Sequence, residues 1–336
     1  MINSIKVVIP MAGYGSRMRP LTWSRPKPLL LVAGKTLLDH ALDQFATLPD
    51  LKKAEYIFII SPNQGDQIQK HMASIHPDKV VHFVVQEKMQ GQSHALLLAE
   101  EYLHGPFVMA FCDTLIETDL EFLRGEDADA VAWVKPMEDP RRFGVAELDK
   151  KGLAVRLVEK PLDCTNNLVL VGFYYFREGQ SLIKAIREQI KRNTSLKGEY
   201  FLADAINIML ESKMKMKVKQ TDVWLDAGIP SAVLETNRYL LDKGYGTRDL
   251  ATGEGVTLIQ PVSIAPGVTI KNSVIGPHVT VGRNCAIENV ILRNSIIDAE
   301  TSIRDLVIEG SLIGRNAMLQ GKAEQFNLGD DADFIR

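Results

Sequence analysis

Residues 8 to 31 read VIPMAGYGSRMRPLTWSRPKPLLL, and this stretch carries the first evidence for both fold and function. The β-branched run from Ile5 to Ile9 leads into it and predicts a strand. A loop with Gly13 and Gly15 follows, and then a series of cations. Glycines let backbone N–H groups approach an anion closely, while fixed cations neutralise a polyphosphate. The segment therefore predicts a strand followed by a loop that wraps a nucleoside triphosphate.

Two more common glycine-rich phosphate loops do not fit this segment. The P-loop pattern G-x-x-x-x-G-K-[ST] is absent from it. The dinucleotide fingerprint needs a third glycine that opens a helix, but Met18 stands at that position. Pro20, Pro26 and Pro28 also disfavour a helix through this stretch. We expect a long, ordered and functional loop instead.

The composition is that of a globular protein with a sizeable core. The chain has 336 residues, of which 46% are hydrophobic and 24% charged, and this length suits two domains. A net charge of −3 without a basic block argues against a nucleic-acid partner. Neither a signal peptide nor a membrane-spanning apolar run is recognisable, so we expect a cytoplasmic protein that does not bind membranes. Cys112, Cys164 and Cys285 are far apart and are expected to be buried, reduced thiols.

Strand and helix patterns alternate along the first half of the chain. Strands are expected over residues 6–10, 55–61, 80–86 and 107–111, and helices over residues 37–48, 64–75 and 93–103. This alternation predicts a mainly parallel sheet with helices on both faces, a Rossmann-like α/β fold. In such sheets, ligands bind beyond the carboxyl ends of the strands. The glycine loop and Asp113 both follow strands, so we expect them at the same edge.

Strand and helix patterns continue beyond residue 130, and after Gly244 the sequence changes character. A strand-rich stretch, 130–176, extends the sheet, and helices are expected over 182–191, 202–212 and 231–243. Aliphatic residues then recur nearly every six positions: Ile264, Ile270, Ile275, Val281, Ile287, Leu292, Ile297, Ile303, Ile308, Ile313 and Leu319. Such a period predicts a β-solenoid of stacked rungs, and the hexad resembles a left-handed parallel β-helix. An ordinary β-domain with short strands is the alternative. We expect domains at 1–244 and 255–321 and an acidic tail at 322–336.

The glycine loop resembles the signature of the sugar-nucleotide pyrophosphorylases, the sugar-1-phosphate nucleotidyltransferases. The matching segments are GYGSRMRPLT at 13–22 and RPKPL at 25–29, and the resemblance covers about the first 240 residues. Met11 and Ala12 precede Gly13, where most members have a double glycine, and this variant is closer to the uridylyltransferase branch. The resemblance implies that four residues bind the nucleotide, namely Met11, Ala12, Gly13 and Gly15. It makes Arg17 and Lys27 the catalytic cations, at the β/γ-phosphates and the α-phosphate.

The resemblance also implies Mg²⁺ as cofactor, held by Asp113 and Asp226. Asp113 follows a buried strand, with Cys112 where the family usually has glycine. Asp226 lies in VWLDAG, residues 223–228, which resembles the family's W-x-D-x-G segment. Hard carboxylate oxygens suit Mg²⁺, and nucleotidyl transfer needs mainly positioning and charge neutralisation. A strand-end turn or helix cap is the alternative for either aspartate alone.

Further segments resemble the sugar-phosphate side of the family's site. Residues 158–161, VEKP, match its E-K-P segment, in which Glu159 would bind sugar hydroxyls and Lys160 the sugar phosphate. A surface salt pair is the alternative for these two residues. Gly144, Gly172 and Glu199 are the remaining sugar-side candidates on the same resemblance.

Gln86 and Gly91 are the candidates for the base pocket. A glutamine amide offers an acceptor and two donors, so it can pair with N3–H and a carbonyl of uracil or thymine. Guanine, with adjacent donors, would prefer a carboxylate. We therefore expect UTP or dTTP as substrate. His94 follows on the next predicted helix, and a structural hydrogen bond is its expected role.

The expected activity is Mg²⁺-dependent transfer of a nucleotidyl group from UTP or dTTP to a sugar-1-phosphate, first of all glucose-1-phosphate. Mannose-1-phosphate guanylyltransferase and a catalytically silent regulatory relative are the alternatives. Some uridylyltransferases carry a long β-helix that transfers an acetyl group, but only about four coils fit here. A stacking surface for a homo-oligomer, or a regulatory site, is expected instead. Neither the sugar nor the choice between uracil and thymine follows from the sequence.

Overall fold

The computed structural model describes residues 4–196, 198–247 and 255–322, and the chain divides into two compact units. The N-terminal unit comprises Met1–Leu30 and Lys35–Val233, and the C-terminal unit comprises Leu31–Gly34 and Leu234–Arg336. The division falls inside helix α6 (Pro230–Leu240), whereas the sequence suggested a boundary after Gly244. The expected acidic tail lies, apart from Lys322, outside the described residues.

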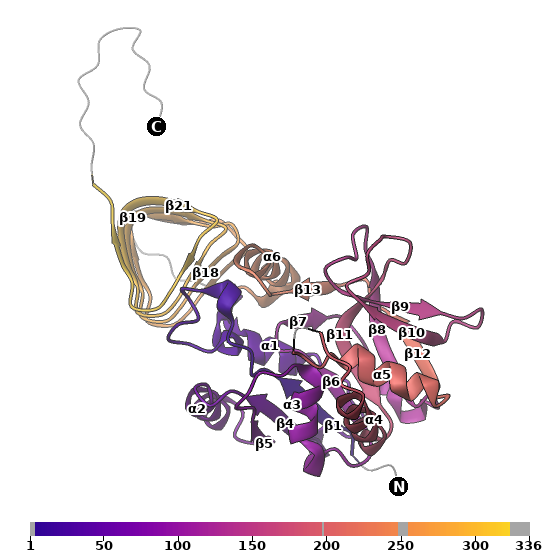
Figure 1. Ribbon diagram of the computed structural model, residues 1–336. Coiled ribbons are helices and arrows are strands. Elements are labelled where there is room, and N and C mark those ends of the chain that lie inside the picture. Colours follow the sequence, from indigo (N-terminus) through magenta and orange to yellow (C-terminus); the bar gives the residue numbers. More distant parts are fainter. Residues whose placement is uncertain (1–3, 197, 248–254, 323–336) are drawn as a thin grey trace. The chain divides into compact units, whose positions relative to one another are not determined.

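The N-terminal unit is built on one mixed sheet (Figure 1). Strands β5, β4, β1 and β6 run parallel in that order, and β11 lies antiparallel to β6 and carries β8 and β9. The strands are β1 (Lys6–Pro10), β4 (Glu55–Ile60), β5 (Val80–Val85), β6 (Phe107–Ala110), β8 (Ala130–Pro136), β9 (Gly144–Leu148), β10 (Ala154–Glu159), β11 (Leu168–Phe176) and β12 (Met216–Gln220). The predicted Rossmann-like α/β class is confirmed.

Helices cover both faces of this sheet because its central strands are apolar on both sides. On β1, Val7 and Ile9 pack into a cluster with α1 (Leu37–Asp43) and α2 (Gly65–Ile75). Val8, which points to the opposite face, joins a cluster with α3 (Gln92–Leu98), α4 (Gly179–Lys191) and α5 (Leu202–Glu211). The two clusters form the core of the unit.

Helix α1 is shorter than the apolar pattern predicts. It begins at a capping box, in which the Thr36 hydroxyl accepts from Asp39 N at 3.2 Å and the Asp39 carboxylate accepts from Thr36 N at 3.0 Å. The helix ends at Asp43 rather than at residue 48. Phe45 and Leu48 are nevertheless buried, because the turns after the helix also face the core. The apolar residues therefore keep a helical spacing beyond Asp43, although the helix itself ends there.

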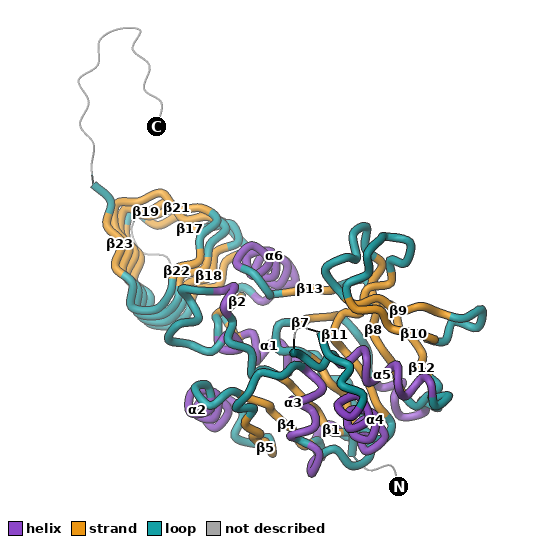
Figure 2. The backbone as a smooth tube through the Cα atoms, viewed as in Figure 1, coloured by secondary structure: helices purple, strands orange, loops and turns teal. Residues whose placement is uncertain are grey.

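The C-terminal unit contains short strands that stack in parallel coils (Figure 2). Ile270 pairs with Ile287, Ile287 with Ile303 and Ile303 with Leu319, so successive coils advance by 17, 16 and 16 residues. The strands are β14 (Val256–Leu258), β15 (Val262–Ile264), β16 (Thr269–Lys271), β17 (Ser273–Ile275), β18 (Val279–Val281), β19 (Ala286–Arg293), β20 (Ile296–Ile297), β21 (Ser302–Glu309), β22 (Leu312–Ile313) and β23 (Met318–Gln320). The predicted parallel β-helix is confirmed, with coils slightly shorter than three full hexads.

At the corners of each coil, residues with a positive φ turn the chain from one face of the β-helix to the next. At one corner Asn272, Asn289 and Asp305 have φ values of 43°, 55° and 57°. Asparagine and aspartate tolerate this region better than other side chains that carry a Cβ. The Asn289 amide also donates to the Asp305 carboxylate at 2.9 Å, which links two successive coils. The small polar residues between the aliphatic positions are thus required by the turns.

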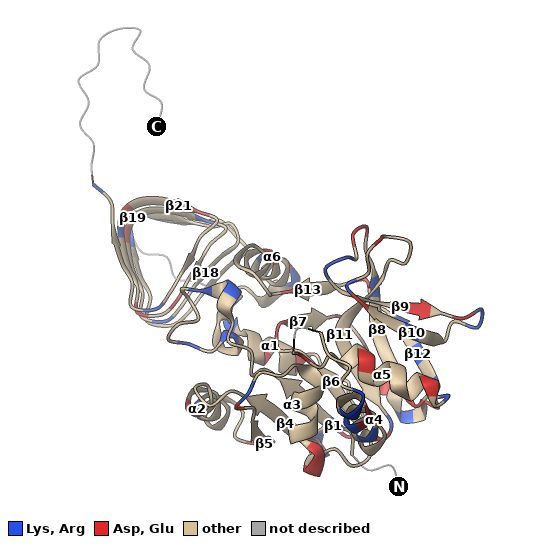
Figure 3. Ribbon diagram, viewed as in Figure 1, with Lys and Arg blue, Asp and Glu red and all other residues tan. Residues whose placement is uncertain are grey.

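Basic and acidic residues are interspersed along the ribbon, as the blue and red segments of Figure 3 show, in keeping with the small net charge. In the part of the chain that the structure describes, no helix is both long and apolar enough to cross a bilayer. Cys112 and Cys285 are buried free thiols as predicted, but Cys164 is exposed because it lies in the loop between β10 and β11.

Candidate active site

A cavity of about 480 Å³ opens in the N-terminal unit beyond the carboxyl ends of β1, β5 and β6. Ten of the residues predicted from the sequence line it: Met11, Ala12, Gly13, Gly15, Arg17, Lys27, Gln86, Gly91, Asp113 and Glu199. They come from segments that are far apart in the chain. The sheet brings them together because parallel strands place their following loops at one edge.

The glycine loop forms one wall of this cavity and is held at both ends. Gly15 has a φ of 60°, and a Cβ there would lie 3.1 Å from the Thr22 methyl group and 3.3 Å from Lys27 Cβ. The Thr22 hydroxyl donates to Gly15 O at 2.7 Å, and the Gln64 amide donates to Gly13 O at 3.0 Å. The loop therefore keeps an ordered course, as predicted, with only the single-turn 3₁₀ helices Ser16–Met18 and Lys27–Leu29.

Lys27 and Asp113 form an ion pair at the centre of the cavity wall. The Lys27 side chain is only 10% exposed, because Pro26 and Pro28 hold its backbone against the core. Cys112 lies next to Asp113, and burial together with that carboxylate raises the pKa of its thiol to about 12. The thiol therefore stays protonated and offers no nucleophile.

Asp226 lies beside Asp113. Strand β13 (Trp224–Asp226) pairs antiparallel with β7 (Thr114–Ile116), which places Asp226 opposite Thr114. The backbone N–H of Ala227 then donates to Asp113 O at 2.9 Å. Burial raises the pKa of Asp226, and the Asp113 carboxylate raises it further. Two partly buried carboxylates side by side form a donor set that a divalent cation with a preference for oxygen would stabilise.

Gln86 is buried at the end of β5, where its amide contacts the chain on one side. The amide nitrogen donates to Gly91 O at 3.2 Å and lies 3.2 Å from Nδ1 of His94. The predicted structural hydrogen bond of His94 is therefore present. With Nδ1 of His94 as acceptor, both amide hydrogens of Gln86 are directed at protein atoms, and its carbonyl oxygen is the polar atom that these two contacts leave. The sequence alone left donor and acceptor equally available.

The backbones at Gly91 and Tyr200 approach each other so closely that a side chain at position 91 has no room. Its φ is 92°, and a Cβ would lie 2.5 Å from Tyr200 O and 2.6 Å from Tyr200 N. Tyr200 N donates to Gln90 O at 2.9 Å, and Ser93 N donates to Tyr200 O at 3.1 Å. These bonds fix the segment around Tyr200 beside the loop that carries Gln90 and Gly91. Glu199 reaches the cavity for this reason.

The other predicted sugar-side residues form a second group that does not line the cavity. Gly144 on β9 pairs with Glu159 on β10, and a Cβ at Gly144 would lie 3.1 Å from Glu159 Oε2. Burial raises the pKa of Glu159, while the Lys160 ammonium, 4.0 Å away, opposes that shift. Lys160 also lies 5.2 Å from the centre of the Phe201 ring. The segment 199–201 thus contacts both groups of residues.

Gly172, a predicted sugar-side residue, lies against an aromatic ring of the protein. A Cβ there would lie 2.6 Å from the ring of Phe111, so the close approach of its backbone is to a protein side chain. Phe111 in turn lines the cavity. Met89 and Tyr14 also line the cavity, and neither they nor Phe111 were among the residues predicted for the site. Tyr14 carried a usable signal, since it lies between the two glycines and is 56% exposed.

The chain is similar to several known proteins. The family described as nucleotidyl transferase matches residues 6–243. The chain is 30% identical to a glucose-1-phosphate thymidylyltransferase of Streptomyces antibioticus, over 97% of this chain and 98% of that protein. It is 32% identical to a low-salt glycan biosynthesis nucleotidyltransferase of Haloferax volcanii, over 96% of this chain and 95% of that protein. It is also 35% identical to the bifunctional protein GlmU of Methanocaldococcus jannaschii, over 70% of this chain but only 54%, about half, of that relative.

Solved structures share the fold at lower identity. A UDP-glucose pyrophosphorylase complexed with UDP-glucose superposes with a TM-score of 0.58 at 22% identity, over 72% of this chain and all of that one. A nucleoside-diphosphate-sugar pyrophosphorylase from Vibrio cholerae gives a TM-score of 0.60 at 20% identity, over 69% of this chain and 99% of that one. With a family match that covers residues 6–243, this chain belongs to the nucleotidyl transferase family.

Proposed function

We propose that this protein transfers a nucleotidyl group from UTP or dTTP to a sugar-1-phosphate, with Mg²⁺ as cofactor and glucose-1-phosphate as the first candidate. The products are an NDP-sugar and pyrophosphate. One observation carries the proposal: Lys27 and Asp113 form an ion pair on the wall of the glycine-loop cavity, with Asp226 beside them. These are the charges that an in-line displacement at phosphorus requires.

The protein's own groups supply most of what the reaction needs. Backbone N–H groups of the glycine loop face the triphosphate, and Lys27 supplies a positive charge beside the α-phosphate. Arg17 is exposed on the cavity wall, where its guanidinium binds the β- and γ-phosphates and stabilises the departing pyrophosphate. Catalysis then consists of positioning and charge neutralisation, without a covalent intermediate on the protein.

Asp113 and Asp226 would hold the metal ion. The pairing of β13 with β7 brings the two carboxylates close together in a partly buried site, where Asp113 adds to the effect of burial in raising the pKa of Asp226. Bound Mg²⁺ neutralises charge on the phosphates. Lys27 pairs with Asp113 and so reduces the repulsion between the carboxylates.

The relatives' names and the base pocket support the choice of substrates. A relative named glucose-1-phosphate thymidylyltransferase aligns with nearly the whole chain, and another structure with this fold holds UDP-glucose. The Gln86 carbonyl can accept from N3–H, which uracil and thymine share. On the sugar side, Glu159 and Lys160 provide an acceptor for hydroxyls and a cation for the phosphate. The predicted homo-oligomer remains a prediction, which sedimentation analysis tests.

A pyrophosphate-release assay tests the proposal. The full-length protein is incubated with ATP, CTP, GTP, UTP or dTTP, each with glucose-, mannose-, galactose- or N-acetylglucosamine-1-phosphate, with and without Mg²⁺. We expect metal-dependent release with UTP or dTTP only. Release confined to GTP and mannose-1-phosphate would support the guanylyltransferase alternative, and no release with any pair would support a regulatory relative. The Asp113→Asn variant serves as the negative control in every reaction.

A further inference from the structure

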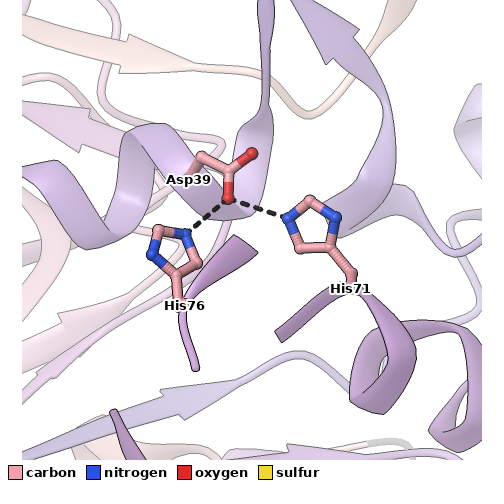
Figure 4. A group of neighbouring side chains, drawn as sticks. All are labelled: Asp39, His71 and His76. Carbon is pink, nitrogen blue, oxygen red and sulfur yellow. Dashed lines mark hydrogen bonds and ion pairs between the residues drawn. The ribbon is translucent and has the colours of Figure 1, made fainter. Parts of the chain in front are cut away.

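Asp39, His71 and His76 gather in the N-terminal unit, and none of the three lines the nucleotide cavity (Figure 4). Asp39 lies in the first turn of α1, His71 lies on α2, and His76 follows the last residue of that helix. The Asp39 oxygen and the two imidazole nitrogens all lie within 4.8 Å of one another. In the described parts of the chain, these three residues are the group with the spacing of a metal site.

The two imidazoles converge on a single oxygen atom. Nε2 of His71 and Nε2 of His76 each lie 2.8 Å from Oδ1 of Asp39 (Figure 4). The other carboxylate oxygen is already engaged, because Thr36 N donates to Oδ2 at 3.0 Å and the Thr36 hydroxyl donates to it at 2.6 Å. The capping box of α1 thus fixes the carboxylate and leaves Oδ1 directed at the histidines.

The three side chains are largely shielded from solvent. The Asp39 side chain is 9% exposed, and those of His71 and His76 are 17% and 19% exposed. A small ion can therefore enter from solvent, while most of its shell would be protein. Thr36, which donates to Oδ2 through its backbone and its hydroxyl, would hold the orientation of the carboxylate ligand.

We propose that Asp39, His71 and His76 form a binding site for a divalent transition metal, and that Zn²⁺ is its ion. Two imidazole nitrogens and one carboxylate oxygen are ligands that Zn²⁺ accepts, with water in the fourth position. In a tetrahedral site with bonds of about 2.1 Å, neighbouring ligand atoms lie roughly 3.4 Å apart. Each separation between Nε2 and Oδ1 would therefore widen from 2.8 Å by roughly half an ångström, and the side chains would turn so that the imidazole lone pairs face the ion instead of Oδ1.

The site would join two helices that are separate in the chain. Asp39 fixes the start of α1, and His71 and His76 fix the end of α2. Both helices cover the same face of the sheet and share one hydrophobic cluster. A metal that binds only the folded arrangement stabilises it by mass action, so we expect the ion to raise the melting temperature.

The competing account is a cluster held by hydrogen bonds alone. Two neutral imidazoles can each donate Nε2–H to Oδ1, which requires no metal. The two accounts differ at Nε2, because a metal needs the lone pair of that nitrogen whereas the hydrogen bond needs its proton.

Zinc titration of the full-length protein distinguishes the two accounts. The protein is prepared without a polyhistidine tag, stripped with EDTA, dialysed, and titrated calorimetrically with ZnCl₂ in excess Mg²⁺ to saturate other carboxylate sites. We expect one equivalent of Zn²⁺ per chain and a higher melting temperature than in EDTA. Co²⁺ in place of Zn²⁺ should give the visible absorption of a four-coordinate ion.

Histidine-to-glutamine variants locate the binding. A glutamine amide can still donate to Asp39 Oδ1, so His71→Gln and His76→Gln keep the packing but remove a metal ligand, and each should abolish the stoichiometric binding. His76→Gln lies beyond the end of α2 and disturbs no helical residue. His82→Gln is the matched control, since His82 Nε2 lies 2.9 Å from a single carboxylate, that of Glu55, and it should bind Zn²⁺ like the wild type. The proposal is overturned if the wild type binds no zinc, or if both ligand variants bind it unchanged.

Discussion

The Lys27 ammonium is paired with the Asp113 carboxylate, although 86 positions separate the two residues in the chain. Lys27 comes from the proline-flanked end of the glycine loop, and Asp113 comes from the turn after β6. Because β1 and β6 are parallel neighbours, their following loops meet at one edge of the sheet. The pair therefore depends on the sheet topology, and it joins the glycine loop to the turn after β6.

The carboxylates are expected to be essential for turnover. Asp113→Asn or Asp226→Asn should lower kcat by about 10³-fold, because loss of several kcal/mol of charge stabilisation has that effect. Steady-state pyrophosphate release at saturating Mg²⁺ measures the change, and circular dichroism checks the fold. Asp43→Asn is the matched control, since Asp43 pairs with Lys35 at an exposed site and should leave kcat unchanged. Wild-type rates in both active-site variants would refute the assignment.

Gln86→Ala should weaken use of the pyrimidine nucleotide. The side chain is buried and engages Gly91 O, so its loss removes both a contact to the base and the support of the loop. We expect kcat/KM for UTP or dTTP to fall by about tenfold to a hundredfold. Gln67→Ala removes an exposed amide that donates to Ser24 O and serves as the control. An unchanged kcat/KM would mean that Gln86 does not contact the base.

Gly91→Ala should destabilise the N-terminal unit more than an ordinary glycine substitution. The added Cβ would lie 2.5 Å from Tyr200 O, so backbone must move in addition to the strain at a φ of 92°. Gly152→Ala is the matched control, because Gly152 has a φ of 78° with no atom near the new Cβ. The control should lose about 1–2 kcal/mol in urea unfolding, and Gly91→Ala should lose more. Equal losses of stability in the two variants would show that the backbone around Tyr200 moves aside at little cost in free energy.

The raised pKa of Glu159 predicts that the stability of the protein depends on pH. Burial raises its pKa above the ordinary value of 4.5, so the folded state holds the proton more tightly than the unfolded state does. Stability is therefore lost as the pH rises from 4.5 through the folded-state pKa. Glu159→Gln removes this loss, so the variant should match the wild type at low pH and exceed its free energy of unfolding at neutral pH.

A control of opposite sign strengthens the Glu159 test. The pKa of Glu188 is lowered by its hydrogen bond to Arg192, so Glu188→Gln should slightly reduce stability at neutral pH. Urea denaturation across the acid and neutral range measures both variants. A Glu159→Gln variant whose stability relative to the wild type did not change with pH would contradict the burial argument.

The β-helix should depend on its stacked interior residues. Ile287 is 1% exposed and pairs in register with Ile270 and Ile303, so Ile287→Ala should cost about 2–5 kcal/mol through the cavity it leaves. Val307 lies in the same sheet but is 74% exposed, and Val307→Ala is the matched control with little expected effect. Thermal or urea unfolding of the full chain distinguishes them. A similar cost for both would mean that the two side chains do not face opposite ways.

The sequence determined the parts of this protein whose physics is local. The apolar runs set the strands, and Gly13 and Gly15 between a strand and three prolines required an open loop. The near-hexad spacing of residues such as Ile287 and Ile303 predicted stacked coils, because each coil must bury its aliphatic side chains on the next. The family resemblance supplied the roles of Lys27, Asp113 and Asp226, and the fold then placed these residues together.

Only the tertiary structure decided which distant atoms meet. It placed the backbone of Tyr200 against Gly91 and the Phe111 ring against Gly172. The convergence of His71 and His76 on Asp39 had no signal in the sequence, since it depends on how α1 packs beside α2. Local patterns fix elements because neighbouring residues act through the backbone, whereas contacts between elements depend on sheet order and packing, which no short segment specifies.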